Sequence, residues 1–504
     1  MRYRPSRPRA EISLVRAMQN PLDMTHAITL VLGFALLACG SSSSDPPGGS
    51  STGSGGAGGS GGQGAGGGDG GGVADPCSAE LLAEPKASTT YYLAIGEAGA
   101  DNDACDGLAP TDEGGGHCPF KDFSSAKTMA LLTDVADVRV ELRAGTYLVY
   151  GWDGLAVRGT GTSEAERVVL SAYPGEHPVL DVPSPDGAAC TGADPTTNPE
   201  CVRQVVRLAG QYTVVQGLTI QNGLAYDAEI NGGAHHLFRC NTLQYTAEFS
   251  QRSDQLKIDG GATDVTVRAN ELTGWWSQAI DITEVHGLVV EENDFHDPHD
   301  ADGGATGSKF GADTVVIRNN TVHDLGSDVG THVFALGGTG STHPDDFEAY
   351  RVQVIGNRVW NAAGILAQVT SCKDCSVEDN EAYDLGAGVL LSASGDVAPC
   401  STAPNGTCLP SEGTLIRGNR LRRMKGGTMP DSANIFVVVE PGQGTGLVGE
   451  DNTYCAPSAA NARFGWPNAA NDGIEMLGFD AWVTKSGTDE TSVVVAESDP
   501  ACAD

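Results

Sequence analysis

Positive charge is scarce in this chain. Its 504 residues include 30 Lys and Arg against 65 Asp and Glu, a formal net charge of −35 at pH 7, and only eight are Lys. A protein that binds DNA or RNA needs a basic face for the phosphates, so this balance excludes nucleic acid as the partner. Hydrophobic residues still make up 40% of the chain, which is enough for a core and excludes a wholly disordered protein.

Several catalytic and metal-binding signatures are also missing. The sequence has no Gly-Lys-Ser phosphate loop and no evident serine nucleophile elbow. A zinc site would need paired clusters, but the chain has a single Cys-x-x-Cys motif, Cys372 to Cys375. We interpret this motif as a closed turn, with a redox role as the alternative. Asn-Gly turns between strands are few, which disfavours an antiparallel sandwich, the alternative fold.

The first 38 residues have the pattern of an export signal. Five Arg precede Met18, and the apolar run from Ile28 to Ala38 follows. Eleven residues of helix span about 16 Å, about half of a bilayer core, so we predict a signal peptide over 1–38 rather than a membrane span. The run ends Leu36-Leu37-Ala38-Cys39, which resembles a bacterial lipobox.

The lipobox resemblance implies a lipid on Cys39 and a place at the bacterial outer membrane or cell surface. An ordinary signal peptide that is cleaved nearby is the alternative. Residues 39–74 are the predicted tether, because 17 of the 35 residues in 40–74 are Gly and cannot form a core. We therefore expect contact with a membrane through the lipid alone.

The cysteine content favours an oxidising compartment. The chain has 13 Cys, and 12 remain when Cys39 is set aside. Six disulfides are our hypothesis, although sequence alone does not fix their connectivity. The suggestive spacings are Cys105/Cys118, Cys190/Cys201, Cys372/Cys375, Cys400/Cys408 and Cys455/Cys502, which leave Cys77 and Cys240.

A repeat runs through the middle of the chain, with the pattern apolar, any, apolar, any, any, Asn. The intervals between successive Asn are 29, 23, 27, 37, 23, 39 and 33 residues, and a minimum near 23 with longer insertions indicates a solenoid. The copies are His236–Asn241, Val265–Asn270, Leu288–Asn293, Val315–Asn320, Val352–Asn357, Cys375–Asn380 and Thr414–Asn419, with a degraded copy at Asn452.

The alternation within each copy predicts a strand, and two more strands per coil are predicted around it. One coil cannot bury its apolar face alone, so the coils must stack. We expect the Asn side chains to form a ladder and the Asn residues to take the left-handed corner conformation. The strands predicted before the repeat are Gln255–Asp259, Ala279–Thr283, His332–Leu336, Gly388–Ser392 and Asn434–Val439.

These units resemble the repeats of right-handed parallel β-helix proteins, the pectate-lyase-like superfamily, over roughly residues 130–450. Val138–Tyr147 and Arg167–Gly175 resemble the opening coils of such proteins. The resemblance implies an all-β solenoid with about three short strands per coil. We assign 75–454 to the solenoid with its N-terminal cap, including a short helix at 123–134. Residues 455–504 form the predicted C-terminal cap, with strands at Trp482–Val483 and Ser492–Val495.

Stacking places equivalent positions of neighbouring coils about 4.7–4.9 Å apart, so outward columns can be derived from the sequence. One column lies three residues past each Asn and has three interpretations. It stabilises the solenoid, offers a sugar platform through His296, His323 and Trp360, or binds a divalent metal through His-Asp pairs. Its members are Gln244, Thr273, His296, His323, Trp360, Tyr383 and Arg422.

A second column brings together Lys257, Asp281 and Lys309. The alternation around Ile280 and the inward assignment of Phe310 predict that these three side chains face outward as neighbours. They form either a plain ladder on a solvated face or a catalytic group. Trp275 and Trp276, in the turn before Asp281, are predicted to stack on a sugar.

The second column suggests β-elimination of a uronate-containing polysaccharide. Several β-helix lyases use a Lys base with Ca²⁺, and this resemblance implies Lys309 or Lys257 as the base. Asp297, Asp300 and Asp302 would hold the Ca²⁺ that neutralises the substrate carboxylate. Asp281 favours the charged form of both lysines, which opposes the base role.

Two alternatives remain open from the sequence. A hydrolase would need two carboxylates about 5–9.5 Å apart, but the Asn-Thr-Asp, paired-Asp and Arg-Ile-Lys signatures of polygalacturonase-like hydrolases are absent. The Arg-x-Pro-x-x-Arg element of common pectate lyases is absent too. The other alternative is a non-catalytic adhesion or scaffold protein. Our prediction is a monomer that binds and cleaves extracellular polysaccharide, with a lyase favoured.

Overall fold

The computed structural model describes residues 77–191, 195–247, 254–299, 304–326, 332–338, 347–392, 409–424 and 434–502. The predicted signal peptide, Cys39 and the tether lie outside these ranges, as do Asp300, Asp302, Cys400 and Cys408. None of the helices within the described ranges is long and apolar enough to cross a membrane.

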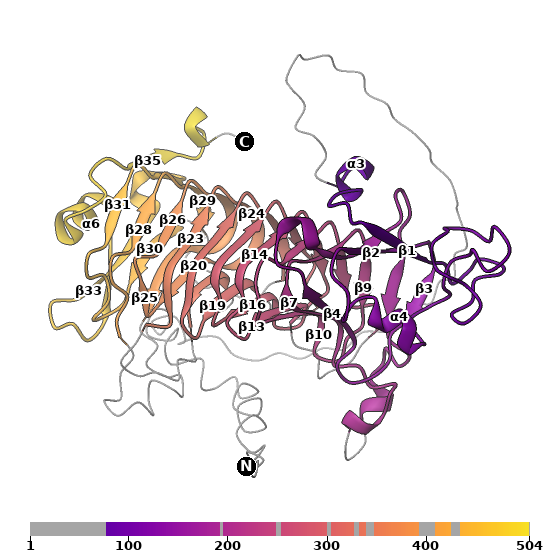
Figure 1. Ribbon diagram of the computed structural model, residues 1–504. Helices are drawn as coiled ribbons and strands as arrows, with labels where there is room; N and C mark the ends of the chain where they lie inside the picture. Colours follow the sequence, from indigo (N-terminus) through magenta and orange to yellow (C-terminus); the bar gives the residue numbers. More distant parts are fainter. Residues whose placement is uncertain are drawn as a thin grey trace, which may run out of the picture.

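The chain winds into a stack of coils with three parallel sheets along its sides (Figure 1). The first face begins each repeat. It consists of β1 (Thr89–Leu93), β2 (Val138–Leu142), β5 (Val168–Ala172), β8 (Thr213–Gln216), β11 (Leu237–Arg239), β14 (Thr263–Arg268), β17 (His286–Glu291), β20 (Ala312–Arg318), β23 (Ala349–Ile355), β26 (Ser376–Glu378), β28 (Leu415–Arg417) and β31 (Val448–Glu450), with β25 (Cys372–Lys373) beside β23.

The second face follows the Asn corner of each coil. It consists of β3 (Thr146–Leu148), β6 (Val179–Asp181), β9 (Thr219–Gln221), β12 (Thr242–Gln244), β15 (Glu271–Thr273), β18 (Asp294–His296), β21 (Thr321–Leu325), β29 (Arg420–Met424), β32 (Thr453–Ala456) and β35 (Val493–Ala496). Two long strands, β24 (Arg358–Thr370) and β27 (Glu381–Ser392), continue from this face into the third.

The third face completes each coil. It consists of β4 (Leu155–Thr160), β7 (Gln204–Gln211), β10 (Tyr226–Asn231), β13 (Leu256–Asp259), β16 (Gln278–Thr283), β19 (Gly304–Lys309), β22 (His332–Gly337), β30 (Asn434–Val439), β33 (Ala462–Pro467) and β34 (Ile474–Leu477). Among the described strands, β33 and β34 form the one antiparallel pair, so the antiparallel sandwich is wrong.

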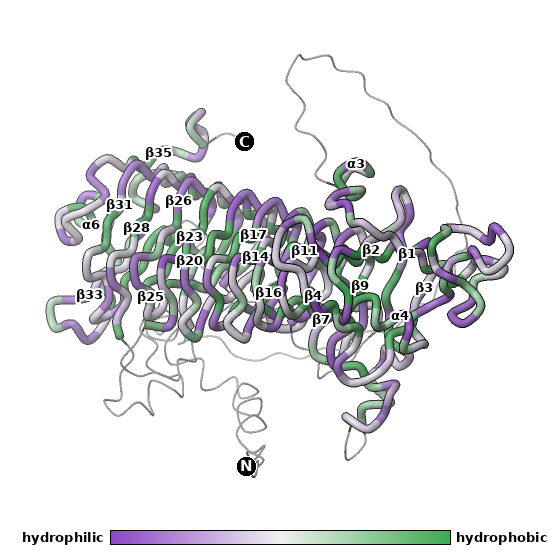
Figure 2. The backbone as a smooth tube through the Cα atoms, viewed as in Figure 1, coloured by the Kyte–Doolittle hydropathy of each residue, from purple (hydrophilic) through white to green (hydrophobic). Residues whose placement is uncertain are grey.

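The core lies inside the coils, and its columns repeat from coil to coil. Leu272, Phe295, Val322 and Val359 succeed one another on the second face, and each is fully buried. The predicted period-two alternation is therefore confirmed, because one side chain in two of each strand faces this interior. Hydrophobic segments recur along the whole stack (Figure 2).

The Asn ladder is confirmed. Asn320 shows the pattern: its Nδ2 donates to Asn357 Oδ1 at 2.9 Å and to the Val290 carbonyl at 3.0 Å, and its Oδ1 accepts from the Asn293 backbone N–H at 2.9 Å. The predicted left-handed Asn is wrong. The residue before the Asn takes that conformation, as Asn319 does with φ 54°, because the ladder Asn must point its amide inward to reach the next coil.

The two ends of the stack differ from the sequence prediction in detail. The N-terminal helix is shorter than predicted, α4 (Ala126–Ala130), and Leu132 after it is buried in the core. At the other end Trp482–Val483 is not a strand. These residues lie in helix α6 (Phe479–Ser486), where the Trp482 ring packs 5.4 Å from Phe464 and its indole N–H donates to Asp489. The strand predicted at Ser492–Val495 is confirmed as β35.

Short helical segments complete the described elements. They are α3 (Ala79–Leu82) and the 3-10 turns η1 (Glu164–Glu166), η2 (Ala188–Cys190), η3 (Pro195–Thr197), η4 (Ala459–Asn461) and η5 (Pro500–Cys502). Five of the six hypothesised disulfides lie within the described residues. They are Cys77–Cys240, Cys105–Cys118, Cys190–Cys201, Cys372–Cys375 and Cys455–Cys502.

Candidate functional site

Lys257, Asp281 and Lys309 meet on the outer side of the third face, as the sequence predicts. Asp281 Oδ2 pairs with Lys257, and Asp281 Oδ1 lies 3.0 Å from Lys309 Nζ. Their side chains are 12%, 9% and 23% exposed, so solvent screens this group weakly. Two ammonium groups on one carboxylate leave a local charge of +1 on a strongly acidic protein.

The route by which Lys309 joins the group differs from the predicted one. Gly307 is the residue in register with Asp281, and Lys309 reaches back from two residues further along β19. Phe310 does not face the core. It is half-buried at a corner with φ 55°, and Lys309 points outward because Ser308 points inward.

The group continues a row of alternating charges across the face. Arg207, Glu229 and Lys257 are successive partners in register on β7, β10 and β13. Glu229 is 2% exposed and lies 3.1 Å from Arg207 Nε, and burial raises the pKa of Glu229 despite the nearby Arg203 and Arg207. Because these alternating charges are largely removed from water, each side chain is held in place by its oppositely charged neighbours.

The row of long side chains stops at Gly307 and Ala335, the next two positions in register. A Cβ at Gly307 would collide with the Gln278 amide, so a larger residue there would displace that flexible side chain. Gln368 is the next residue in the row, in register with Ala335. Gln278 and Gln368 were not among the predicted site residues; the Gly inside this strand was the available signal in the sequence.

Strand β19, with the sequence Gly-Ala-Thr-Gly-Ser-Lys, is unusual for this core. Its inward residues Thr306 and Ser308 occupy columns that Ile280 and Ile282 fill on the preceding coil. Both are fully buried, and neither hydroxyl has a hydrogen-bond partner within the described residues. Residues that oppose stability concentrate at functional sites, so the composition of β19 indicates a functional site near this strand.

Replacing Thr306 with Val is expected to stabilise the protein. The two side chains have nearly the same shape, and Val leaves no buried hydroxyl unsatisfied, so the free energy of unfolding should rise by about 1 kcal/mol. Denaturant unfolding followed by circular dichroism measures the change. Thr266→Val, at a half-buried outward position of β14, is the matched control and should leave the midpoint unchanged. An unchanged or lower midpoint for Thr306→Val would show that the hydroxyl is satisfied.

The predicted ring column exists on the second face, and its rings stack on one another. His296 and His323 lie 5.1 Å apart at 9°, and His323 and Trp360 lie 4.8 Å apart at 4°. Tyr383 continues the stack 6.0 Å from Trp360. The rings cover one another's faces, and a sugar needs an open ring face. We interpret the column as structural, and sugar binding by His296, His323 and Trp360 stays a prediction.

The His side chains of this column already form hydrogen bonds with neighbouring carboxylates. His296 contacts Asp297 at 3.0 Å and Glu271 at 3.3 Å, and His323 contacts Asp324 at 2.7 Å. Burial opposes protonation of His296, but its hydrogen bonds to Asp297 and Glu271 outweigh it and raise its pKa. Both imidazoles are therefore already engaged by carboxylates of the column.

Other predicted residues are not brought together. Trp275 is fully buried in the core and cannot contact a substrate, so that prediction is wrong, and Trp276 stacks on His299 at 3.7 Å. Asp297 contacts His296 on the second face, whereas Lys309 is the last residue of β19 on the third face. No cluster of three or more metal-ligating side chains occurs among the described residues.

Comparison with known proteins agrees with the topology. A protein-family model described as a right-handed β-helix region matches residues 204–343 and, in an overlapping second match, residues 257–409. This chain is a right-handed parallel β-helix. The β-helix therefore contains the Asn ladder, the ring column and the Lys257–Asp281–Lys309 group.

Several solved structures resemble this chain at low sequence identity and with TM-scores below 0.5. Pectate lyase Pel9A is 14% identical, over 75% of this chain and 82% of that one, with a TM-score of 0.49. A rhamnogalacturonan lyase is 12% identical over 80% and 99%, with a TM-score of 0.46. PfbA, a surface adhesin of Streptococcus pneumoniae, is 13% identical over 67% and 86%, with a TM-score of 0.36. No curated protein matches in sequence. A shared fold leaves function open.

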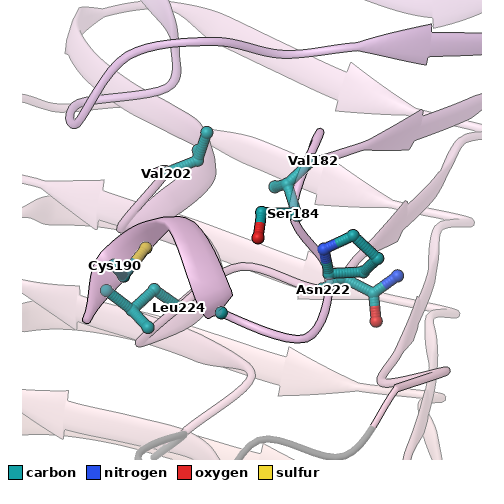
Figure 3. Close-up of a pocket in the computed structure, with 8 residues that line it drawn as sticks. Val182, Ser184, Cys190, Val202, Asn222 and Leu224 are labelled. Atoms are coloured by element: carbon teal, nitrogen blue, oxygen red, sulfur yellow. The ribbon is translucent and has the colours of Figure 1, made fainter. Parts of the chain in front are cut away.

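A small pocket lies in the N-terminal part of the β-helix (Figure 3). It is a shallow space beside the Cys190–Cys201 disulfide, and Val202 and Leu224 line it. The Asn222 amide on its wall already donates to Asp181 and Thr246. The pocket therefore offers little polar chemistry to a ligand.

Proposed function

We propose that this β-helix binds an acidic polysaccharide on its third face and cleaves it by β-elimination. The carrying observation is the Lys257–Asp281–Lys309 group, a half-buried cluster of net charge +1 on a chain of net charge −35. A uronate carboxylate is the sugar group that such a cluster attracts. As elimination proceeds, negative charge builds on this carboxylate, so fixed ammonium groups stabilise the transition state more than the bound substrate.

In this proposal the lysines act as cations rather than as the base. Both ammonium groups are ion-paired with Asp281, and a lysine that acts as a base must first be neutral. Asp281 then positions the two ammonium groups, and its acceptor capacity is used by them. Ca²⁺ on Asp297, Asp300 and Asp302 remains a proposal that the elimination does not require, since the lysines supply positive charge themselves.

A substrate screen tests the proposal. The purified protein is incubated with polyuronates and with neutral polysaccharides, with Ca²⁺ and with a chelator. Elimination leaves a double bond conjugated to the carboxylate, and its ultraviolet absorbance should rise for a polyuronate and not for neutral glycans. New reducing ends without that absorbance would favour a hydrolase. Binding of glycans without either product would favour the adhesion or scaffold alternative.

We further propose that the β-helix is displayed at the bacterial surface by a lipid on Cys39. The lipobox-like Leu36-Leu37-Ala38-Cys39 and the Gly-rich tether support this. Partition of the full chain into the membrane fraction, and its loss in Cys39→Ser, tests it.

A further inference from the structure

A second pair of cations holds a carboxylate on the third face, in the same row as the lysines. Glu229 on β10 lies between two arginines: its Oε2 is 3.1 Å from Arg207 Nε, and its Oε1 is 3.6 Å from Arg203 Nη1. The register partner of Glu229 on the next coil is Lys257, which in turn pairs with Asp281. A buried carboxylate between two cations therefore occurs twice along this face.

The two arginines differ in how far their guanidinium groups are already engaged. Besides the shared carboxylate, Arg207 donates from Nη2 to Asn231 Oδ1 at 2.8 Å, and its Nη1 lies 3.9 Å from the largely exposed Asp153 carboxylate. Arg203 lies over the Tyr226 ring, 5.1 Å from its centroid. Among the described residues, the Arg203 side chain forms no hydrogen bond or ion pair beyond the shared carboxylate, and it is 36% exposed. Its guanidinium therefore keeps N–H donors for a ligand.

The backbone of Arg203 is fixed by both neighbouring coils. Arg203 directly precedes β7, and its N–H donates to the Trp152 carbonyl at 3.0 Å. Its own carbonyl accepts from the N–H groups of Ala225 at 2.9 Å and Tyr226 at 3.1 Å. Because the residue is already held in place, a ligand that binds the guanidinium loses little free energy in ordering it.

The spacing of the two clusters suits a polyuronate. Strands β7, β10, β13, β16 and β19 follow one another along the β-helix axis (Figure 1). Glu229 and Asp281 are two coils apart, which is about 10 Å along the axis. This is close to the length of two sugar residues in an extended polysaccharide. Where successive sugars alternate in orientation, the carboxylates of every second uronate lie on the same side of the polymer.

We propose that Arg203 is a second carboxylate-binding residue, so that the polysaccharide lies along the axis with one uronate on Arg203 and the next but one on the lysines. Glu229 is the positioning residue of Arg203. This inference rests on the proposed function. It narrows the substrate to an acidic polysaccharide that carries uronates at least at alternate positions, because a polymer with isolated uronates reaches only one of the two clusters.

The test compares two oligomers of the polyuronate that the wild type cleaves, one long enough to reach both clusters and one too short. Arg203→Ala should lower kcat/KM for the long oligomer by about 10-fold, the effect of losing one hydrogen-bonded contact between charged groups. The loss should appear in KM with kcat little changed, since the contact is remote from the bond that breaks. For the short oligomer kcat/KM should stay unchanged. The ratio of the two values cancels any difference in the folded fraction.

A matched arginine on another face controls for the loss of charge. Arg351 on β23 is 54% exposed and paired with Asp313, and Arg351→Ala should behave as the wild type with both oligomers. Arg203→Lys keeps the charge without the planar fork and should give an intermediate loss for the long oligomer. If Arg203→Ala does not fold, Arg203→Gln takes its place, because it removes the charge and keeps a polar side chain beside Glu229.

The outcomes separate the two proposals. A wild type that neither binds nor cleaves a polyuronate overturns the proposed function and, with it, this inference. A wild type that binds without cleaving overturns the elimination alone, and the same comparison of variants is then made on Kd by calorimetry. If Arg203→Ala loses equally with both oligomers, or loses nothing, this inference is overturned while the proposed function stands.

Discussion

Replacing Lys309 with Ala is expected to lower kcat/KM for a polyuronate by about 10²–10³-fold, the usual cost of removing one group that stabilises developing negative charge. Lys309 and Lys257 share Asp281, so the variant converts a cluster of net charge +1 into a neutral Lys257–Asp281 pair. The attraction for the substrate carboxylate falls with it. Steady-state rates of double-bond formation, followed by ultraviolet absorbance, give kcat/KM for the variant and the wild type.

A matched Lys variant separates this local effect from the loss of a positive charge as such. Lys373 is half-buried on the first face, 5.5 Å from the Phe347 ring, and Lys373→Ala should leave kcat/KM within about twofold of the wild type. Lys309→Arg keeps the charge but not the compact ammonium, so partial activity is expected. If Lys309→Ala cleaves as fast as Lys373→Ala, the third face is not the catalytic site.

Replacing Asn320 with Ala is expected to lower the free energy of unfolding by about 3–4 kcal/mol, since roughly 1 kcal/mol is lost per hydrogen bond. The side chain donates to the Val290 carbonyl and to Asn357, and it accepts from both the backbone and the side chain of Asn293. All these groups are buried, so each lost partner leaves a polar atom out of reach of water.

Thr321→Ala, at the next residue, is the control for the ladder. Thr321 is half-buried and points outward on β21, and its replacement should cost less than about 0.5 kcal/mol. Because each coil contacts mainly its neighbours, the loss in Asn320→Ala should concentrate in the central coils. Hydrogen exchange resolves this, with faster exchange expected near β20 and β21. Uniform exchange across the β-helix would contradict a local ladder defect.

The sequence by itself determined the coil architecture and the neighbours within each column. In a stack of parallel coils, an equivalent position in the repeat becomes a contact about 4.8 Å away, whatever the length of the intervening loop. The Asn spacing therefore sufficed to predict the amide ladder, and the alternation around Ile280 sufficed to place Lys257 beside Asp281. Five disulfides agree with the spacings, and three of them close local loops of 13, 11 and 3 residues, for which short separation along the chain is the reason.

Only the tertiary structure decided the orientation of the side chains and the contacts that they make. The rings of His323 and Trp360 stack on each other, so each covers one face of the other. Trp275 turns into the core, and Lys309 reaches back across Gly307 to Asp281. The Gln278 amide lies over Gly307 of the next coil, a position that the sequence pattern did not mark.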